Sequence, residues 1–397
     1  MRKILIPNGS FHDIPLIRKA RELGYYVITS GAAPDGIGHQ YADKYIEADF
    51  SDREAMLRIA EQEGIDRICS NCNDFGYLSA CYVAEKLELG GHESYENALR
   101  LHRKDLFKKI AEELELSTPR AKSFDRINEA EEWLLGTETE GLYPLMVKAA
   151  DLGAGQGIHR ADNRAEAAEV LKDAFERSKC HEVVIEPFIE GTSHSFNAFV
   201  VNGKVASWYS DNEYMDYTPY RVSTSLGPAD GIEDCLPTLI WDTEVTAEAL
   251  ALPDGLMHSQ YIMDSEGRPH ILEITRRMSG DWYPYPQMRA TGIDWVEYIM
   301  RSQCGDDCSD FPKGIRQKRN TGRHCLNGSR PGIVKNVRFH KELEPYIYDA
   351  AMWIGDGFEI RDPLKDYPGI IFFDCDDREK IEHIVRHIDR YVELVYE

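Results

Sequence analysis

The stretch 257–281 holds the residue types with the clearest capacity for chemistry. Its pattern predicts two strands joined by a tight turn. Glu273 and Thr275 would share one face of the second strand, with Gln260 beside them on the first, because side chains alternate along a strand. A carboxylate, an amide oxygen and a hydroxyl are ligands that Mg²⁺ accepts. Two arginines follow at once: Arg276 and Arg277. The pattern therefore predicts a site for magnesium and a polyphosphate; the alternative is an amphipathic hairpin whose polar face only meets water.

A second candidate combines a lysine with a glycine loop. Lys148 closes the apolar strand 145–149, and glycines follow at alternate positions: Gly153, Gly155 and Gly157. Such a loop can fold over phosphates, because glycine permits backbone conformations that turn several N–H groups toward one anion. It is not a Walker loop, because the lysine precedes the glycines. The alternative is an ordinary loop, with Lys148 extending to solvent from a sheet edge.

A third candidate is the segment 183–191, an apolar strand that ends in Glu-Pro-Phe-Ile-Glu-Gly. Backbone polar groups and the Glu186 carboxylate would lie beside apolar surface there. An adenine ring needs that combination, because its amino group donates and its faces are apolar. The alternative is a strand that runs into an ordinary loop.

The elements that must position these residues fall into two classes. Over the first 90 residues short apolar strands alternate with helices, which predicts a parallel sheet with helices on both faces. The turn after its first strand, 7–12, lacks G-x-G-x-x-G, so a dinucleotide-binding domain is disfavoured. From about residue 143 longer β segments predict an α+β region with antiparallel sheets. We expect a hairpin at Asn202-Gly203 between strands 195–201 and 204–210.

The last hundred residues predict further strands and a closing helix. Strands are expected near 333–338 and 369–373, and a helix over about 378–395. With the preceding segments, the expected fold class is α/β and α+β combined.

In this order the segments resemble the ATP-grasp superfamily, and most closely its carboxylate–amine ligases of the L-amino acid ligase type. The resemblance covers essentially the whole chain. It implies a parallel α/β N-terminal domain over 1–100, before a two-lobed ATP-grasp fold with antiparallel sheets. Its central subdomain with the glycine loop would span 101–192, and its C-terminal subdomain with a lid region would span 193–397.

The resemblance also implies a nucleotide site. Lys104 would reach the α-phosphate, Lys148 would contact α- and β-phosphate oxygens, and the loop 153–157 would cover the phosphates. The implied adenine hinge consists of Glu186, Phe188 and Ile189. Ser193 stands where the family commonly has an acidic residue that holds the ribose.

The implied catalytic centre contains one or two Mg²⁺ ions, or Mn²⁺. Glu273 would bind the metal, and Arg277 together with Lys148 would stabilise the phosphoryl group during transfer. Two positions depart from the family: Gln260 replaces a metal-binding acid and Thr275 replaces an asparagine. A glutamine carbonyl can coordinate Mg²⁺ but brings no charge to offset it.

The implied reaction is an ATP-dependent coupling of a small carboxylic acid, activated as an acyl phosphate, to an amine, with an amino acid as one substrate. Candidate substrate residues are Arg276, Asp281, Trp282 and His258. Two alternatives stay open: a nucleotide-binding module without catalysis, and a carboxylase-type enzyme that uses bicarbonate.

Charge and composition restrict the partners. The net charge of −23 opposes nucleic acid and anionic membranes, and 42% hydrophobic residues are ordinary for a soluble protein. The nine cysteines, without a secretory signal, favour reduced thiols in the cytoplasm. Zinc at Cys304, Cys308, His324 and Cys325 fits no common spacing, and a redox role for Cys69 and Cys72 is equally disfavoured. We expect small-molecule carboxylate and amine partners and, from the resemblance, a homodimer.

Overall fold

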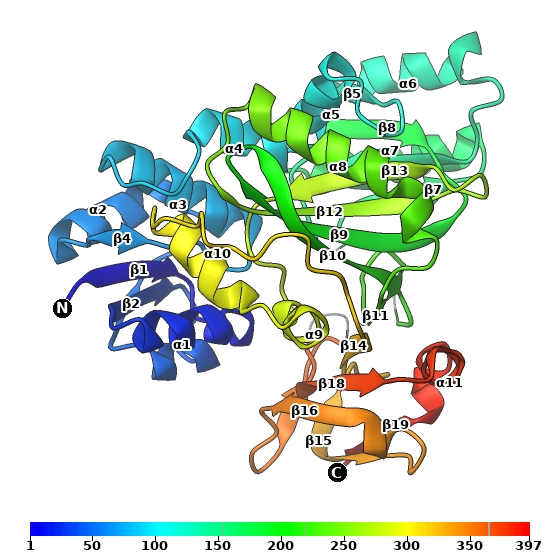
Figure 1. Ribbon diagram of the computed structural model, residues 1–397. Helices are drawn as coiled ribbons and strands as arrows, with labels where there is room; N and C mark the ends of the chain where they lie inside the picture. Colours follow the sequence, from blue (N-terminus) through cyan, green and yellow to red (C-terminus); the bar gives the residue numbers. More distant parts are fainter. Residues whose placement is uncertain (154, 218, 364–365) are drawn as a thin grey trace.

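Four sheets organise the chain in the computed structural model, which describes residues 1–153, 155–217, 219–363 and 366–397. Figure 1 shows the N-terminal sheet (blue) on the left, the central sheet with its helices at the upper right and the C-terminal strands (orange and red) below. The expected combination of a parallel α/β part with antiparallel sheets is confirmed.

The N-terminal sheet is parallel and has the strand order β3-β2-β1-β4. Its apolar strands are buried because helices lie along them; Ile4, Leu5 and Ile6 of β1 are inaccessible to solvent. The elements are β1 (Lys3–Pro7), α1 (Ile14–Glu22), β2 (Tyr26–Gly31), β3 (Lys44–Glu47), α2 (Arg53–Glu63), β4 (Arg67–Ile68), α3 (Asp74–Lys86) and α4 (Tyr95–His102).

The central sheet is antiparallel, in the order β5-β8-β6-β7, and carries the glycine loop between β6 and β7. Its core is self-contained, since the buried cluster that includes Val147, Leu171 and Ile185 draws on residues 124–185 alone. The elements are α5 (Lys104–Glu113), β5 (Lys122–Phe124), α6 (Ile127–Leu135), β6 (Leu145–Ala149), β7 (Ile158–Ala161), α7 (Arg164–Arg177) and β8 (Val183–Pro187).

The large sheet has eight strands in the order β13-β12-β9-β10-β11-β14-β18-β16, and a small sheet, β17-β15-β19, lies beyond it. The strands of the large sheet are β9 (Thr192–Val201), β10 (Lys204–Tyr214), β11 (Thr224–Gly227), β12 (Gly255–Met263), β13 (Pro269–Thr275), β14 (Asn320–Cys325), β16 (Ile347–Met352) and β18 (Gly369–Cys375). The remaining elements are α8 (Ile232–Ala249), α9 (Pro284–Thr291), α10 (Trp295–Gln303), β15 (Gly332–Phe339), β17 (Phe358–Ile360), α11 (Arg378–Val385) and β19 (Val392–Tyr396).

The hairpin at Asn202-Gly203 is confirmed: Val201 pairs with Lys204, and both turn residues have positive φ. Two predicted boundaries are wrong. β10 continues past Ser210 to Tyr214, and the helix expected over 378–395 ends at Val385 and gives way to β19. β19 forms because it pairs with β15, a tertiary contact that overrides the local helical pattern.

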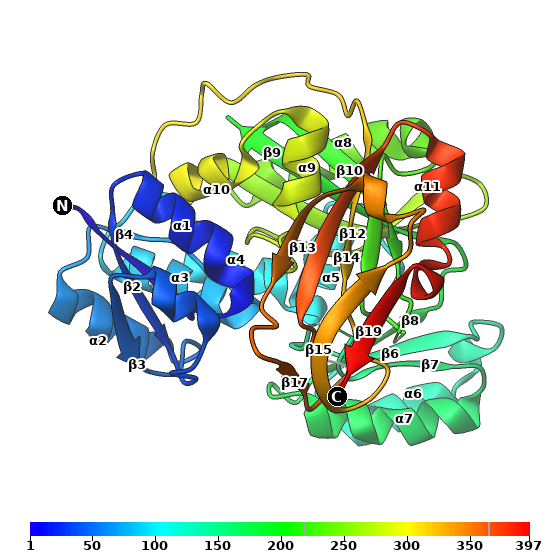
Figure 2. The ribbon, with the colours of Figure 1, turned by 90° about the horizontal axis from the view of Figure 1, so that it is seen from below.

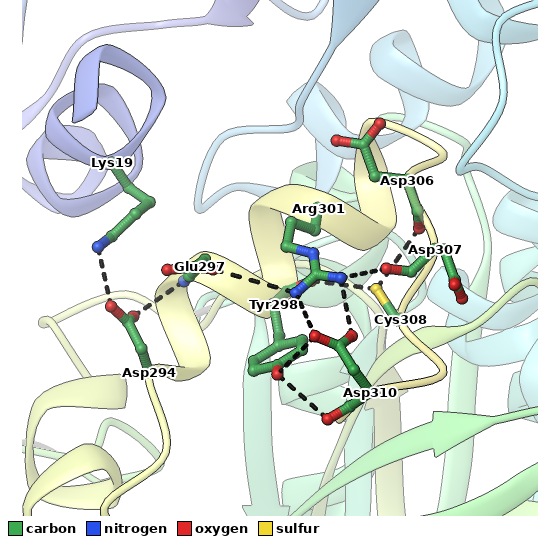
Figure 3. A network of polar contacts seen from close by, with 9 residues as sticks. All are labelled: Lys19, Asp294, Glu297, Tyr298, Arg301, Asp306, Asp307, Cys308 and Asp310. Atoms are coloured by element: carbon green, nitrogen blue, oxygen red, sulfur yellow. Dashed lines mark hydrogen bonds and ion pairs between the residues drawn. The ribbon is translucent and has the colours of Figure 1, made fainter. Parts of the chain in front are cut away.

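Helix α10 joins the N-terminal sheet to the large sheet. Figure 2 shows α10 beside α1, and Lys19 of α1 forms a 2.8 Å ion pair with Asp294, whose side chain also caps α10. Figure 3 shows this contact together with Arg301, which pairs with Asp310 at 2.7 Å and fixes the loop that follows α10. One buried cluster runs through β1, α1, β9, β12 and α10. Among the described residues no helix is long and apolar enough to cross a membrane.

Candidate active site

One face of the large sheet is lined with polar side chains in two adjacent rows. In the first row Glu273 lies opposite Gln260, Gln260 opposite Ser195, and Ser195 opposite Asp211. The second row holds Thr275, His258 and Asn197. The structure therefore places the three predicted metal-site residues together, because antiparallel register brings β12 and β13 into step.

Lys104 of α5 reaches this face, whereas Lys108 of α5 and Lys148 of β6 meet at Glu186 on β8. Lys104 donates to the Leu152 carbonyl oxygen at 2.7 Å and lies 3.4 Å from a Glu273 carboxylate oxygen. Lys148 forms an ion pair with Glu186, and Lys108 pairs with the other oxygen of Glu186 at 2.7 Å. Lys104 and Lys148, the two lysines predicted to bind phosphate, thus lie beside Glu273 and Glu186, which are predicted to bind the metal and the adenine.

Lys108 was missing from the sequence prediction. The sequence feature that could have identified it is its position four residues after Lys104, which puts both side chains on one face of α5. Burial lowers the pKa of Lys108, whereas Glu186 opposes that change. Burial alone would raise the pKa of Glu186, which is 1% exposed, but Lys108 and Lys148 bring it to about 2.

The glycine loop lies between β6 and β7, next to Lys104 and Lys148 in the fold. Gly155 and Gly157 have φ of 75° and 63°, where an L side chain is strained. A Cβ at Gly157 would lie 2.9 Å from that of Ala149, whereas at Gly153 the nearest atom would be an Asp74 oxygen at 3.4 Å. Ala154, inside the predicted loop 153–157, lies outside the described residues.

The predicted adenine hinge follows β8 directly. The Phe188 amide donates to the Pro144 carbonyl oxygen at 2.8 Å, and the Arg160 guanidinium lies 4.4 Å from the centre of the Phe188 ring. No hydrogen bond is recorded for the Ile189 amide within the described part of the chain, so that N–H is available to an acceptor such as a purine nitrogen. Ser193 lies on β9, opposite Ile262.

Arg277 connects the large sheet to the N-terminal domain. Its Nε donates to Asp74 at the start of α3 at 2.7 Å, and His102 approaches the same carboxylate oxygen at 3.2 Å. Burial would raise the pKa of Asp74, but Arg277 and His102 hold it well below its usual range. Asp74 thereby fixes the guanidinium beside Glu273, whose charge also acts on it.

Two predicted substrate residues have structural contacts. Arg276 is 4% exposed; it pairs with the buried Glu93 at 3.3 Å and donates to the Pro253 carbonyl oxygen at 2.8 Å. Trp282 is buried, and its indole N–H donates to the Phe11 carbonyl oxygen at 2.8 Å. Both side chains hold the N-terminal domain against the large sheet, and a role for them in substrate binding stays a prediction.

The other two predicted substrate residues remain near the site. His258 donates from Nδ1 to the Asn197 amide oxygen at 3.0 Å. Burial, with Arg277 and Arg323 adding to it, lowers the pKa of His258 to about 3, so the ring is neutral at neutral pH. Asp281 accepts a hydrogen bond from the Tyr367 hydroxyl and lies 3.7 Å from Arg323.

Two carboxylates on β10, Asp211 and Glu213, were also missed, because the predicted strand stopped at Ser210. Ser195 donates to Asp211 at 2.6 Å. The Gln260 amide donates to both oxygens of Glu213, at 3.2 and 3.0 Å. Burial, with Asp211 adding to it, raises the pKa of Glu213 to about 8. Had the predicted strand been extended past Ser210, the alternation of side chains would have placed Asp211 and Glu213 on the same face of the sheet.

A cavity of about 320 Å³ opens beside Lys104 and Glu273, between the N-terminal and central parts. Its walls are partly apolar, with Phe75, Leu78 and Leu99. Its basic lining residues are Arg53, His102, Arg103, Lys104 and Lys179. Its acidic lining residues are Asp74, Asp151 and Glu273, so the lining is mixed in charge, in contrast to the chain's net charge of −23.

All nine cysteines are free. His324, considered on sequence grounds with Cys304, Cys308 and Cys325 as a zinc ligand, bonds to the Thr224 hydroxyl at 2.7 Å. Across the described residues no group of three or more His, Cys, Asp or Glu side chains is arranged to hold a metal ion. A metal at the sheet face would therefore also need ligands from a nucleotide.

Known proteins share this sequence and fold in part. Residues 102–216 match the family model described as phosphoribosylglycinamide synthetase, ATP-grasp (A) domain. A D-alanine–D-alanine ligase of Parabacteroides distasonis is 27% identical over 182 residues, or 41% of this chain and 51% of that protein. The match thus spans about half the length of that relative.

Two solved structures are similar over the whole chain. The L-amino acid ligase of Bacillus licheniformis has a TM-score of 0.81 and 19% identity, covering 100% of this chain and 99% of its own. The biotin carboxylase domain dimer of Hydrogenobacter thermophilus 2-oxoglutarate carboxylase, solved with MgADP, ADP and bicarbonate, has a TM-score of 0.81 and 15% identity, covering 100% and 91%. These two structures share the fold of the whole chain, and the family assignment rests on the matched domain. Residues 102–216 belong to an ATP-grasp domain, and the chain as a whole has the ATP-grasp fold.

Proposed function

We propose that the protein is an ATP- and Mg²⁺-dependent ligase that activates a carboxylic acid as an acyl phosphate and couples it to an amine, with an amino acid as one substrate. One observation carries the proposal. Lys104 of α5 and Glu273 of β13 meet at 3.4 Å beside a cavity, with Gln260 opposite Glu273 and Arg277 four residues further along the chain. A phosphate-binding lysine beside a metal-binding carboxylate is what phosphoryl transfer requires.

The residues present fit ATP with magnesium. Glu273, the Gln260 carbonyl and the Thr275 hydroxyl are oxygen donors, and the Thr275 hydroxyl is buried without a hydrogen-bond partner among the described residues. When bound, magnesium would neutralise the phosphate oxygens. The Ile189 amide and Phe188 would hold the adenine, and the loop 153–157 would cover the phosphates with its N–H groups.

The chain's own groups then supply the remaining chemistry. A carboxylate is a poor acyl donor, so its oxygen attacks the γ-phosphorus of ATP in line, which releases ADP and forms an acyl phosphate. Lys148 and Arg277 stabilise negative charge on the phosphoryl group as it transfers. The amine attacks the acyl carbon, phosphate leaves, and the amine loses its proton. The reaction needs no protein nucleophile.

The acid would bind in the cavity beside Lys104. Its apolar wall would receive the carbon chain, and its basic residues would orient the carboxylate toward Glu273 and Lys104. The proposal divides the chain into the parts 1–100, 101–192 and 193–397. It also includes a cytoplasmic location, where ATP is available, and a homodimer, because one similar solved structure is a dimer.

Phosphate and ADP release in the presence of ATP, Mg²⁺ and panels of acid–amine pairs tests the function. We expect turnover with at least one pair, and its loss in Lys148→Ala and Glu273→Ala. Lys204→Ala is the matched control, because Lys204 is exposed, and neither it nor its ion-pair partner Glu244 lines the cavity.

Other outcomes separate the alternatives. ADP release that depends on bicarbonate without added amine would identify a carboxylase-type enzyme. Tight ATP binding without turnover over the whole panel would identify a nucleotide-binding module. Unchanged turnover in both site variants would overturn the assignment of the site.

A further inference from the structure

We propose that Glu213, on β10, supplies the second carboxylate of the magnesium site, in place of the acid that Gln260 has replaced on β12. This inference rests on the proposed function, because it concerns how the same site holds Mg²⁺ with a nucleotide. Glu273, Glu213 and the Gln260 carbonyl would be the protein's ligands, and the nucleotide phosphates would supply the others.

The strand register places Glu213 on the polar face of the large sheet. Asp211 lies in the row of Glu273 and Gln260, and Glu213 is two residues further along β10, so its side chain points to the same side. The contact with Gln260 confirms this, since both Glu213 oxygens lie within 3.2 Å of the Gln260 amide nitrogen. Strand β9 lies between β10 and β12, so the Glu213 carboxylate on β10 reaches the Gln260 side chain on β12 across one intervening strand.

The direction of that hydrogen bond matters for coordination. The Gln260 NH₂ group faces Glu213 and donates to both of its oxygens. The carbonyl oxygen of Gln260 is then the group left for a cation or a ligand. Gln260 thereby acts as a bridge that holds Glu213 in place and contributes one neutral oxygen of its own.

The charges around Glu213 call for a cation. Glu213 is 8% exposed, and among the described residues no ion pair to it is recorded. Asp211 and Glu273 act on it with negative charge, and the buried Arg323 guanidinium, which pairs with Asp281 at 3.7 Å, acts on it with positive charge. Burying these carboxylates with a share of one guanidinium is costly unless further positive charge joins them. Glu186, by contrast, is buried with two lysines in direct contact.

Two further oxygens on this face are also buried and lack a partner among the described residues. They are Oδ2 of Asp211 and the hydroxyl of Thr275. Thr275 lies two residues from Glu273 on the same face of β13, and Asp211 lies in the row of Glu273. Buried polar atoms are nearly always satisfied in folded proteins, so these orphaned oxygens indicate a ligand at this place.

The test measures Mn²⁺ binding to the full-length protein in the presence of ADP, by electron paramagnetic resonance of free Mn²⁺. Glu213→Gln should weaken Mn²⁺ binding about tenfold or more, since even groups in the second layer around a metal contribute about 10–100-fold. The exchange variant Glu213→Gln/Gln260→Glu should recover most of the affinity, because it returns the carboxylate to β12 and keeps an amide beside it.

A control and a second measurement separate metal binding from a structural role. Asp242→Asn removes another buried carboxylate, on α8, and should bind Mn²⁺ like the wild type. In EDTA, Glu213→Gln should melt no lower than the wild type, because glutamine keeps the shape of the side chain and removes the cost of burying a carboxyl group there. The rise in melting temperature on adding Mn²⁺ and ADP should shrink.

Each outcome decides the proposal. The proposal is overturned if Glu213→Gln binds Mn²⁺ with wild-type affinity. It is also overturned if Glu213→Gln/Gln260→Glu binds Mn²⁺ as weakly as Glu213→Gln. A lower melting temperature of Glu213→Gln in EDTA would assign Glu213 a structural role instead. A wild-type protein that binds neither ADP nor Mn²⁺ with ADP would overturn the proposed function itself.

Discussion

At the scale of single residues, the site contains buried carboxylates with different neutralising partners. Glu186 accepts from Lys148 and Lys108, and Asp74 accepts from Arg277 and His102. Within the described residues, the recorded donor to Glu213 is the neutral amide of Gln260. A carboxylate with cationic partners contributes to folding when ionised, whereas one without them needs a ligand to offset its desolvation.

Glu186 should make the stability of the protein fall in acid. Its folded pKa of about 2 lies below the value near 4.3 of an unfolded glutamate, so its contribution is fully present above that higher value and is lost as the pH falls through about 2. The difference corresponds to about 3 kcal/mol. Urea unfolding at pH 7 and pH 3 should show roughly half of it, because pH 3 lies between the two pKa values.

The matched variants are Glu186→Gln and Glu233→Gln, the latter on the exposed side of α8. In Glu186→Gln the loss of unfolding free energy between pH 7 and pH 3 should be smaller than in the wild type. In Glu233→Gln it should be unchanged. An identical acid dependence in all three proteins would show that Glu186 does not titrate as its lysine contacts require.

At the scale of elements, the sequence predicted most of the segments that hold the site but not all of their ends. The hairpin β12–β13 and the strand β6 with its glycine loop follow from local alternation and glycine spacing, which the chain itself encodes. The end of β10 did not follow, because Asp211-Asn212-Glu213 are poor strand formers and are extended only by pairing with β9 and β11.

Arg276 shows a second limit of sequence-based prediction. It directly precedes Arg277, and nothing local distinguishes the two guanidinium groups. Because successive side chains leave the backbone on different sides, Arg277 reaches Asp74 near the site, whereas Arg276 reaches Glu93 in the interface with the N-terminal domain. The partner of each arginine comes from a distant segment, so only the tertiary fold separates the proposed phosphate ligand, Arg277, from the interface ion pair of Arg276.

The glycine loop provides a test at this scale. Gly157→Ala should raise the KM for ATP and destabilise the fold by roughly 1–3 kcal/mol, because its φ is positive and the new Cβ would lie 2.9 Å from that of Ala149. Gly153→Ala meets only an ordinary contact at 3.4 Å and should change neither quantity much. Steady-state kinetics and urea unfolding of the pair provide the comparison. Equal effects of the two substitutions would contradict a requirement for the left-handed backbone at Gly157.

At the scale of the whole molecule, the N-terminal sheet and the large sheet share one core. The buried cluster runs from Ile4 and Leu16 to Phe199 and Trp295, and Lys19 of α1 pairs with Asp294 at the start of α10. The central sheet keeps a separate core over residues 124–185. We therefore expect two cooperative units, with the central sheet able to open without the rest.

Hydrogen exchange tests this division. Trp295→Ala should lower protection in β1 and α10 together, by about 3–5 kcal/mol, and leave β6 unchanged. Leu171→Ala, in the core of the central sheet, should do the reverse, by about 2–5 kcal/mol. Loss of protection throughout the molecule in either variant would mean that the three parts unfold as one unit.

The contact between Gln260 and Glu213 has a consequence for how proteins of this fold are classified. A sequence pattern that requires an acidic residue at position 260 examines one strand only, and it would classify this chain as an inactive member. The face of a sheet is two-dimensional, however, so the same charge can be supplied from β10 across β9. Inventories of degenerate active sites would therefore be more reliable if they compared side chains across neighbouring strands and not only along one.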